Sequence, residues 1–558
     1  MINLTAKIPW RLNTRLRIAL ILLLIISFLS YQFIFISNIF DYQIHWFDPS
    51  SKISYCLGSQ VYLRNVSRLP KIQYDFNNTP ETINEKLIRE TRRESIKKGF
   101  QHAWNGYTKY AWGKDELEPV TNNSNNRFNG WGATIVDSLD TMWIMDLKDE
   151  FNRSRDFVET VDFSKSDNVI SVFETTIRYL GGLLSAYEFS NDHVFLDKAL
   201  ELGNALLPSF NSVSGFPYDS WDLSWNNDKT FRRPWTTANL AQIGTLQLEF
   251  MKLSQLTGDS EFFFKINNIT QVLDSIPKPI PGLYPLYLDH ETGEFIAHDI
   301  SFGGSGDSFY EYLIKQYIFV GGAIDQFRRM YIESIDSMHK HLIKEGRIES
   351  RPDLLFIGEL SYGSFVGKLQ HLTCFVPGML AIGSKVLNRP QDLEVAIKLA
   401  DSCYWAYEMT YTGIGPEDLW YMSSNDTFNE PEKKTMNNRK DKNLPDGVIK
   451  LGHSYKLRPE TIESLFILYR VTGDRAYQDK GWKIWQAIEK WCKTSSAYSG
   501  LINVNSEKVT QNNNMESFFL AETLKYLYLL FSPPDLISLD TYVFNTEAHP
   551  FLRMARTF

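Results

Sequence analysis

Apolar residues recur at helical spacing along most of the chain. From residue 81 onward, segments dominated by Leu, Ile, Phe and Tyr alternate with segments in which charged residues occupy one face, and a short polar turn joins the two. Apolar positions at i, i+3, i+4 and i+7 predict an amphipathic helix, and a segment that is apolar on all sides predicts a buried one. The pattern therefore predicts an all-α fold in which outer helices cover inner ones.

The junction between the two helices of a pair is itself repeated. Segments 183–207, 246–273 and 463–488 each place Ser or Thr two residues before Asp in the turn, and segment 379–407 is a looser copy. Repetition of one helical hairpin indicates a single array of equivalent units. Roughly seven pairs can be recognised, which predicts a closed barrel of paired helices. An open helical solenoid and a barrel of six pairs are the alternatives.

The N-terminus carries a different signal. Residues 18–36 contain no charge, and Lys7, Arg11, Arg15 and Arg17 precede them. A stretch of this length spans a bilayer, and basic residues on one side predict that this side stays in the cytosol. A cleaved signal peptide is the alternative, but the run is long for one and no small-residue cleavage site follows it. The predicted order is a cytosolic tail (1–17), a transmembrane signal anchor (18–37), a luminal stem (38–75) and the helical domain (76–558).

Composition excludes several classes of protein. The net charge of −8 argues against a nucleic-acid-binding surface. Four cysteines are too few to build the fold from disulfides, although one bridge is compatible with them, and spacing alone does not choose the pair. No C-x-x-C or H-E-x-x-H motif supports a zinc site. Acceptor motifs for N-glycosylation, which suit a secretory protein, begin at Asn65, Asn77, Asn122, Asn152, Asn268 and Asn425.

Carboxylates stand at the start of several apolar helices. The residues concerned are Asp137, Glu174, Asp307, Glu460 and Glu516. In a closed barrel these starts meet at one end, so we expect a ring of acids around a central pocket, joined by Glu463 one turn after Glu460. The helix dipole favours acids at any helix start, and for Glu463 or Glu516 taken singly this is an equal alternative. The coincidence across repeats favours a functional ring.

Aromatic residues accompany these acids. The segments also contain Phe173, Phe309, Tyr310, Phe518 and Phe519, of which Tyr310 and Phe519 are expected in the core. Ring faces beside carboxylates suit a sugar, whose C–H faces stack on rings and whose hydroxyls donate to acids. Hydrolysis of a glycosidic bond needs one carboxylic acid to protonate the leaving oxygen and a second carboxylate as base or nucleophile.

The C-terminal segment 538–551 places the polar sequence NTEAH directly after a strand-like apolar run. If this segment enters the barrel along its axis, Thr546 and Glu547 lie at the floor of the acid ring. A hard cation bound there would find oxygen ligands and would offset the negative charge.

These segments together resemble one known family. The sequence is similar to the class I α-1,2-mannosidases, glycoside hydrolase family 47, through motifs at 130–147, 172–187, 306–316, 371–378, 457–474, 515–531 and 542–550. The resemblance implies an (α/α)7 barrel with a C-terminal β-hairpin plug. It also implies calcium-dependent removal of α-1,2-linked mannose from Man9GlcNAc2-type N-glycans, with inversion at the anomeric carbon.

The resemblance assigns roles residue by residue. Glu174 matches the general acid, Glu460 the base that activates water, and Asp307 a third essential carboxylate. Thr546 matches the residue that binds Ca²⁺. The predicted substrate-binding residues are Arg178, Arg458, Glu463, Phe518, Glu522, Glu547, Asp137 and His371, the last of which would otherwise be an ordinary core histidine. Cys374 and Cys403 match the family's disulfide pair.

One position departs from the family pattern. Ser305 stands two residues before Asp307, where the endoplasmic reticulum branch tends to carry Arg and the Golgi branch Leu. The anchored, luminal layout predicts a single-pass type II protein of the endoplasmic reticulum membrane, with the Golgi membrane as the alternative. A mannose-binding, lectin-like relative that targets glycoproteins for degradation is the other functional alternative. The presence of Glu174, Asp307 and Glu460 argues against it.

Overall fold

The computed structural model describes residues 53–55, 61–63, 69–224, 237–424 and 444–554. The chain divides into two units, and residues 66–555 form the larger one. The predicted cytosolic tail, the anchor and most of the stem lie outside the described residues. Within the described ranges, no helix is both long enough and apolar enough to cross a membrane.

The larger unit is mostly helical, and its inner helices follow one another around a ring. Each inner helix packs against the next, and the last returns to the first through the π-helical turn η6 (Phe519–Thr523) that precedes it. The inner helices are α4 (Leu139–Ile144), α7 (Gly181–Ser190), α10 (Gln247–Thr257), α12 (Asp307–Phe319), α14 (Val376–Val386), α17 (Glu460–Thr472) and α19 (Leu524–Leu530). In α17 every residue from Thr461 to Val471 is buried, as expected for a helix that is apolar on all sides.

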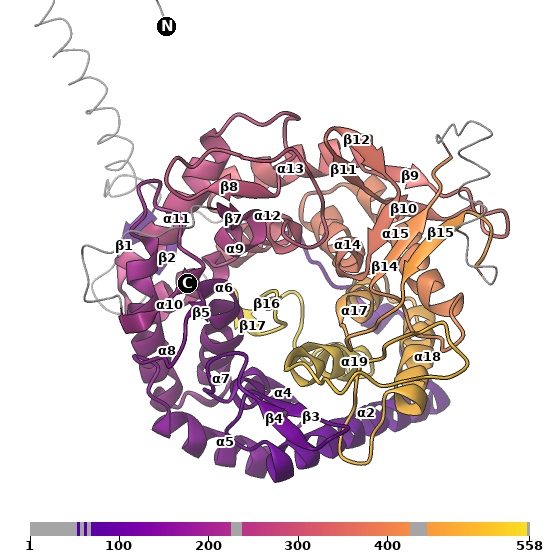
Figure 1. Ribbon diagram of the computed structural model, residues 1–558, viewed down its shortest axis with the longest axis horizontal. Coiled ribbons are helices and arrows are strands. Elements are labelled where there is room, and N and C mark those ends of the chain that lie inside the picture. Colours follow the sequence, from indigo (N-terminus) through magenta and orange to yellow (C-terminus); the bar gives the residue numbers. More distant parts are fainter. Residues whose placement is uncertain (1–52, 56–60, 64–68, 225–236, 425–443, 555–558) are drawn as a thin grey trace, which may run out of the picture. The chain divides into compact units, whose positions relative to one another are not determined.

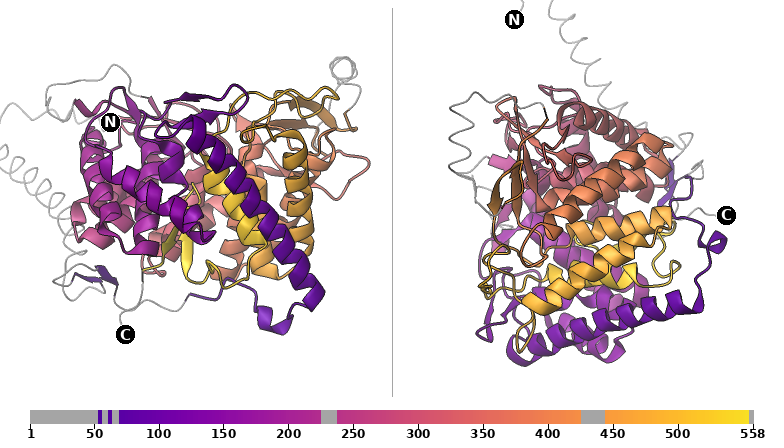
Figure 2. Two further views of the ribbon diagram at one scale, coloured as in Figure 1. Left: turned by 90° about the horizontal axis from the view of Figure 1, so that it is seen from below. Right: turned by 90° about the vertical axis from the view of Figure 1, so that its right-hand side faces the viewer.

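An outer layer of helices covers this ring. The outer helices are α2 (Ile83–Tyr110), α5 (Lys148–Thr160), α8 (His193–Leu206), α11 (Ser260–Ser275), α13 (Asp325–His341), α15 (Pro390–Glu408) and α18 (Ala476–Trp491). Each of them packs on an inner helix, and the long α2 lies along α19 and α18 (Figure 2). Thr82 begins α2 with a reciprocal cap, in which its hydroxyl accepts from the Glu85 N–H and the Glu85 carboxylate accepts from the Thr82 N–H.

The described residues also form short helical turns and strands, of which those before residue 66 belong to the smaller unit. The short helical turns are η1 (Phe76–Asn78), α3 (Ala133–Asp137), α6 (Val172–Glu174), η2 (Thr175–Leu180), η3 (Leu207–Phe210), α9 (Leu240–Gly244) and η5 (His371–Phe375). The strands are β1 (Ile53–Tyr55), β2 (Val61–Leu63), β3 (Glu116–Glu118), β4 (Asn123–Asn125), β5 (Ile170–Ser171), β6 (Ser220–Trp221), β7 (Thr237–Asn239), β8 (Tyr287–Asp289), β9 (Ile343–Glu345), β10 (Leu355–Ile357), β11 (Glu359–Ser361), β12 (Ser364–Val366), β13 (Lys368–Gln370), β14 (Asp418–Tyr421), β15 (Val448–Gly452), β16 (Tyr542–Phe544) and β17 (Pro550–Leu552). All described strand pairs are antiparallel, and the order β13–β14–β15 forms a three-stranded sheet.

The repeated polar turn has the same hydrogen bond in all three predicted copies. The N–H groups of Asp192, Asp259 and Asp474 each donate to the hydroxyl two residues earlier, at 3.2 Å in every case. Each Asp then accepts from the N–H two residues later, and in this way Asp192 caps α8 and Asp259 caps α11. The predicted helical-hairpin repeat is confirmed at these turns.

The ring encircles the hairpin formed by β16 and β17 (Figure 1). Tyr542 pairs with Leu552 and Phe544 with Pro550. The Asn545 side chain holds the turn: its oxygen accepts from the N–H of His549 at 2.7 Å, and its amide donates to Glu249 on α10 at 2.8 Å. Hydrogen bonds to surrounding helices therefore fix the turn that carries the predicted Thr546 and Glu547.

Candidate active site

A pocket of about 330 Å³ opens among the starts of the inner helices and the turn of the hairpin. Most of the predicted site residues line it, and they come from segments far apart in the sequence. They are Glu174, Arg178, Asp307, Arg458, Glu460, Glu463, Phe518, Glu522, Thr546 and Glu547. The structure therefore brings the three predicted catalytic carboxylates to one cavity.

Glu460 begins α17, and its two carboxylate oxygens face two different side chains, His371 and Arg458. Its Oε2 lies 2.7 Å from His371 Nδ1, and its Oε1 lies 3.7 Å from Arg458 Nη1. Burial alone would raise the pKa of this carboxyl, but the hydrogen bond to His371 and the charge of Arg458 lower it below its ordinary value. Glu460 is thus an ionised carboxylate, as a base must be.

Asp307 begins α12 and has the opposite electrostatic setting. Burial raises the pKa of its carboxyl to about 7, and the charges of Glu311 and Glu460 add to this rise. The Ser308 N–H, which donates to the carboxylate at 2.8 Å, opposes it. A carboxyl with this pKa holds a proton up to neutral pH. Asp307 and Glu460 therefore differ in protonation although they line one pocket.

Glu174 ends α6 and meets Arg178 across the start of a π-helical turn. Arg178 Nε donates to Glu174 Oε2 at 2.8 Å, while its Nη1 contacts Glu547 and lies 3.4 Å from Asp137. π-helical turns are rare and frequently occur at functional sites. A second one, η6, carries Glu522 to the same pocket.

Asp137 and His371 do not line the pocket but contact residues that do. Asp137 is fully buried, and its carboxylate accepts from Arg178 and Ser517. His371 is buried beside Glu460. Their assignment to substrate binding stays a prediction. Their observed contacts show that they hold Arg178 and Glu460.

Behind Asp137 a buried ionic chain fixes the hairpin. His549 Nε2 lies 3.1 Å from Asp137 Oδ1, and its Nδ1 lies 2.9 Å from Asp140 Oδ2. Lys525 completes the chain at 2.8 Å from Asp140 Oδ1. Desolvation would lower the pKa of His549, but its two aspartate partners raise it above its ordinary value. The chain links α3, α4 and α19 to the end of the hairpin turn.

The floor of the pocket has an excess of acids. Burial raises the pKa of Glu463 to about 8, a shift that Lys315 opposes and Glu311 adds to. Burial and the charges of Glu460 and Glu463 also raise the pKa of Glu522 well above its ordinary value. Such shifts show that the charged forms lack sufficient positive charge nearby.

Thr546 lies at this floor, where its hydroxyl donates to Glu311 Oε2 at 2.9 Å. The oxygen atoms around it belong to hydroxyl and carboxylate groups, which are the type of ligand that Ca²⁺ prefers. Over the described ranges, no group of three or more His, Cys, Asp and Glu side chains has the arrangement of a metal site. The residues fit a hard cation held partly by other oxygens, such as those of water or a sugar.

The backbone is strained at positions that border the pocket. Leu457, directly before Arg458, has φ of +64°, an unusual value for a bulky residue. Its carbonyl accepts from Thr523 Oγ1 at 2.7 Å, which helps to hold it. Ser305 also has a positive φ, +75°, and lines the pocket. Such strain tends to occur at functional sites.

Some outcomes differ from the predicted acid ring. Glu516 does not line the pocket; it contacts Arg127 at 3.5 Å. Tyr310 and Phe519 are buried in the core as predicted, whereas Phe173 lines the pocket. The expectation that all five helix-starting acids surround the pocket is therefore wrong for Glu516 and for the buried Asp137.

Other pocket residues were not predicted. Glu311 lies one helical turn after Asp307, so helical spacing in that motif was a signal for it. Asn239 and Gln242 form a reciprocal helix cap, whose spacing is visible in the sequence, but nothing there relates it to the pocket. Tyr407 lies outside the pocket but contacts His371, and it too was not predicted because no sequence signal connects the two residues.

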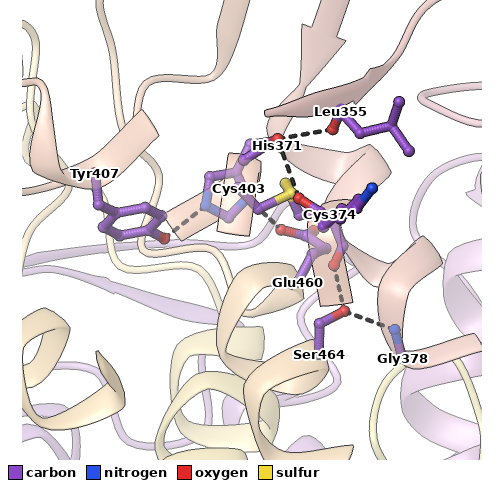
Figure 3. Close-up of a disulfide and its surroundings, with 10 residues drawn as sticks. Leu355, His371, Cys374, Gly378, Cys403, Tyr407, Glu460 and Ser464 are labelled. Carbon is purple, nitrogen blue, oxygen red and sulfur yellow. Dashed lines mark hydrogen bonds and ion pairs between the residues drawn. A yellow bond between two sulfur atoms is a disulfide. The ribbon is translucent and has the colours of Figure 1, made fainter. Parts of the chain in front are cut away.

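The predicted disulfide is present. Cys374 in η5 and Cys403 in α15 are bonded across a separation of 29 residues. Among the described residues, Cys492 is the free cysteine, and it is buried. The bridge lies beside Glu460 and His371 (Figure 3).

Several carboxylates in one pocket can supply the pair of carboxyl groups with which most glycoside hydrolases cleave their substrates. A family model described as glycosyl hydrolase family 47 matches residues 99–553. The chain is 40% identical over 511 residues to the mannosyl-oligosaccharide 1,2-alpha-mannosidase MNS1 of Arabidopsis thaliana, covering 88% of this chain and 85% of that protein. It is 41% identical over 466 residues to the endoplasmic reticulum mannosyl-oligosaccharide 1,2-alpha-mannosidase of Homo sapiens, covering 82% of this chain and 64% of that protein.

A solved structure agrees with these sequence matches. The alpha-1,2-mannosidase from Trichoderma reesei superimposes with a TM-score of 0.77 at 34% identity, covering 83% of this chain and 99% of that one. The protein belongs to glycosyl hydrolase family 47, and it is therefore a glycoside hydrolase.

Proposed function

We propose that this enzyme removes terminal α-1,2-linked mannose from high-mannose N-glycans of the Man9GlcNAc2 type. The observation that carries the proposal is the meeting of Glu174, Asp307 and Glu460 in one pocket of about 330 Å³. The names of the relatives from Arabidopsis thaliana and Homo sapiens support the same substrate class. A pocket lined by acids and by Phe518 suits the hydroxyls and the C–H face of one terminal sugar.

We propose that the larger unit is an (α/α)7 barrel closed at its centre by the C-terminal hairpin. The consecutive packing of the inner helices, each with an outer partner, supports this architecture. So do the antiparallel pairing of β16 with β17 and their position within the ring. In this arrangement the hairpin turn forms the floor of the pocket, and the starts of the inner helices form its wall.

The proposed reaction inverts the anomeric configuration. Glu460, kept ionised by His371 and Arg458, removes a proton from water as the water attacks the anomeric carbon. A carboxylic acid on the other side donates a proton to the oxygen of the departing glycan. The products are free β-mannose and a glycan shortened by one residue.

The family resemblance gives the acid role to Glu174, and the structure offers Asp307 as a second candidate. A general acid is most effective when its pKa is near the working pH. The pKa of Asp307 is about 7, whereas Glu174 is in an ion pair with Arg178. We therefore propose that Asp307 supplies the proton, directly or through a water. Glu174 orients the oxygen of the departing glycan, which accepts that proton.

We propose Ca²⁺ as the cofactor, with Thr546 as its protein contact. A bound Ca²⁺ would supply positive charge and oxygen coordination at the floor of the pocket. The acid-rich floor around Thr546, with its oxygen donors and raised pKa values, supports this choice. Glu311, Glu463 and Glu522 would orient waters and sugar hydroxyls there.

We propose the endoplasmic reticulum membrane as the location, with the catalytic unit in the lumen. The support is the uncharged run at 18–36 preceded by basic residues, together with the endoplasmic reticulum relative. The Golgi membrane is the alternative, and Ser305 at the pocket matches neither branch of the family. A lectin-like role is the weaker functional candidate because the carboxylates are present together in the pocket.

The function is tested by incubating the purified full-length protein with Man9GlcNAc2 and following the products by mass spectrometry and NMR. We expect mannose to be released and to appear first as the β anomer. A matched variant, Glu460→Gln, should bind the glycan and release mannose at least about a hundredfold more slowly. Binding without release by the unaltered protein would instead support the lectin-like role.

A further inference from the structure

Three residues from three separate elements form a continuous chain of hydrogen bonds that ends at the proposed base. Tyr407 OH, on α15, lies 2.6 Å from His371 Nε2, and His371 Nδ1, in η5, lies 2.7 Å from Glu460 Oε2, on α17 (Figure 3). Tyr407 and His371 are 2% and 4% exposed. Tyr407 does not line the pocket, and its hydrogen bond to His371 connects it to Glu460, which does.

The same three elements are joined a second time, close to each member of the chain. Cys403 lies four residues before Tyr407, and its disulfide partner Cys374 lies three residues after His371. The Cys374 carbonyl accepts a hydrogen bond from Ser464 Oγ, four residues after Glu460 (Figure 3). The disulfide and this hydrogen bond therefore set the spacing of α15, η5 and α17 where the chain crosses them.

The direction of the hydrogen bonds follows from the ionised state of Glu460, because a carboxylate can only accept a hydrogen bond. Burial and then the charge of Glu460 raise the pKa of Tyr407 above its ordinary value, although the hydroxyl groups of Thr461 and Tyr455 beside it oppose the shift. The phenol thus keeps its hydrogen, and it donates that hydrogen to His371 Nε2 because the ring's own hydrogen is needed on Nδ1, which faces the Glu460 carboxylate. A neutral imidazole that accepts at Nε2 carries its hydrogen on Nδ1 and donates it to Glu460.

We propose that Tyr407 is a positioning residue that holds the His371 imidazole through its Nε2, so that the Nδ1–H of His371 donates to Glu460 and keeps the base ionised. This inference rests on the proposed role of Glu460 as the base. Without the phenol, His371 Nε2 would be a buried acceptor with no donor. The imidazole would then lose the contact that holds its Nε2 edge, and its Nδ1–H would donate to the carboxylate in a poorer geometry.

Other charged groups around Glu460 are separate from this chain. Arg458 approaches the second carboxylate oxygen at 3.7 Å and is held in turn by Glu417 at 2.8 Å. The charge of Glu460 itself raises the pKa values of Asp307, Glu463 and Glu522, so these acids also face it. Among the described residues, none of these groups forms a hydrogen bond or an ion pair with Tyr407. Within the described part of the chain, the hydrogen-bonded connection from Tyr407 to the Glu460 carboxylate therefore runs through His371.

The first experiment compares kcat/KM against pH for the unaltered full-length enzyme and Tyr407→Phe. Loss of one hydrogen bond to the imidazole should move the acidic limb upward by about half to one pH unit, a threefold to tenfold loss on that limb. The basic limb should not move. Tyr411→Phe, which alters a half-exposed tyrosine three residues after α15, is the matched control and should leave both limbs in place. An unmoved acidic limb in folded Tyr407→Phe would overturn the proposal.

The second experiment asks whether Tyr407 acts through His371. In a His371→Asn background the phenol has no imidazole to fix, so adding Tyr407→Phe should change the acidic limb less than about twofold. A purely structural role would give additive losses in the double variant, and that result would overturn the proposal. Thermal unfolding of each variant shows whether it is folded.

A third measurement uses only the unaltered protein, so it stands even if Tyr407→Phe does not fold. NMR of protein labelled with ¹⁵N-histidine, with His371 assigned by its absence in His371→Asn, should show hydrogen on Nδ1. Hydrogen on Nε2 alone would contradict the inference. If the unaltered protein releases no mannose, the proposed function fails, but the tautomer measurement still tests the hydrogen-bond chain independently.

Discussion

Arg178 Nε donates to Glu174 Oε2 across 2.8 Å, and the same guanidinium contacts Glu547 in the hairpin turn. One buried arginine thus joins a pocket acid at the end of α6 to the floor of the pocket. Asp137 lies behind it at 3.4 Å. The position of Glu174 therefore depends on the hairpin. Arg178 and Glu547 are 369 residues apart in the chain.

Replacement of Arg178 by alanine should cost both stability and activity. Removal of one partner from a buried ionic cluster leaves uncompensated charge and typically costs about 3 to 5 kcal/mol. We expect the free energy of unfolding to fall by about that amount and mannose release to fall by at least about tenfold. Arg127→Ala is the matched control, since its side chain is 51% exposed in its pairs with Glu116 and Glu516, and it should cost less than about 1 kcal/mol. Equal effects in denaturant unfolding would contradict the view that Arg178 organises the site.

Asp307→Asn should remove the basic limb of the pH profile. The pKa of Asp307 is raised to about 7, so the protonated form is lost, and kcat/KM should fall, as pH rises through about 7. Asparagine has no proton to donate, so activity should drop about a hundredfold or more and become insensitive to pH on that side. Glu516→Gln, at an acid outside the pocket, should keep the limb. A basic limb that persists in Asp307→Asn but disappears in Glu174→Gln would return the acid role to Glu174.

Removal of calcium should destabilise the protein more at high pH than at low pH. The pKa of Glu463 is about 8 in the fold against about 4.5 unfolded, so between these values the unfolded chain binds fewer protons and the free energy of unfolding falls as pH rises. Glu522 shifts in the same direction. A bound cation should offset this loss, adding about 2.7 kcal/mol at a free calcium concentration about one hundred times Kd.

The calcium prediction is checked by thermal unfolding and by mannose release after chelation, at pH 5 and pH 8. Chelation should abolish release, and calcium should restore it more fully than magnesium, which prefers tighter octahedral coordination. A Thr546→Val variant should lose the response to calcium. Full activity after exhaustive chelation, or equal destabilisation at both pH values, would refute the proposed cofactor or its location among these acids.

The disulfide should contribute measurably to stability. Closing a loop of 29 residues between Cys374 and Cys403 corresponds to about 3 to 4 kcal/mol in the loop-entropy model. We expect the double variant Cys374→Ser/Cys403→Ser to lose about that much in denaturant unfolding, and Cys492→Ala, the control at the free cysteine, to lose about 1 kcal/mol. Peptide mapping of the unreduced protein should recover the bridged peptides. Two free thiols in active enzyme would contradict the assignment.

The anchor prediction concerns residues 18–36, outside the described residues. If this uncharged run is a signal anchor, the mature protein should retain it and should partition with membranes. N-terminal sequencing of the native protein measures this directly. A mature N-terminus beyond residue 36 would show cleavage and a released form.

Much of the helical layer and of the pocket could be predicted from local sequence. The alternation of apolar and amphipathic segments predicted inner and outer helices, and the Ser/Thr-x-Asp turns recur with one hydrogen bond at 3.2 Å. Both signals are local, because helical periodicity and turn capping depend on residues within a few positions. Glu174, Asp307 and Glu460 could be singled out because each begins an apolar helix, and they do line the pocket.

The tertiary structure decided which polar groups face one another. Glu516 begins its segment as Glu460 does, yet it lies outside the pocket beside Arg127, and Asp137 is buried behind Arg178. Tyr407 and His371 are 36 residues apart, and His371 and Glu460 are 89 apart, so no periodicity relates them. Protonation likewise depends on burial and on charges from other helices, which is why Asp307 and Glu460, both acids at helix starts, have pKa values shifted in opposite directions. The sequence by itself determined the helices and their acidic starts, but only packing in three dimensions set the distances and the burial on which acid and base chemistry depends.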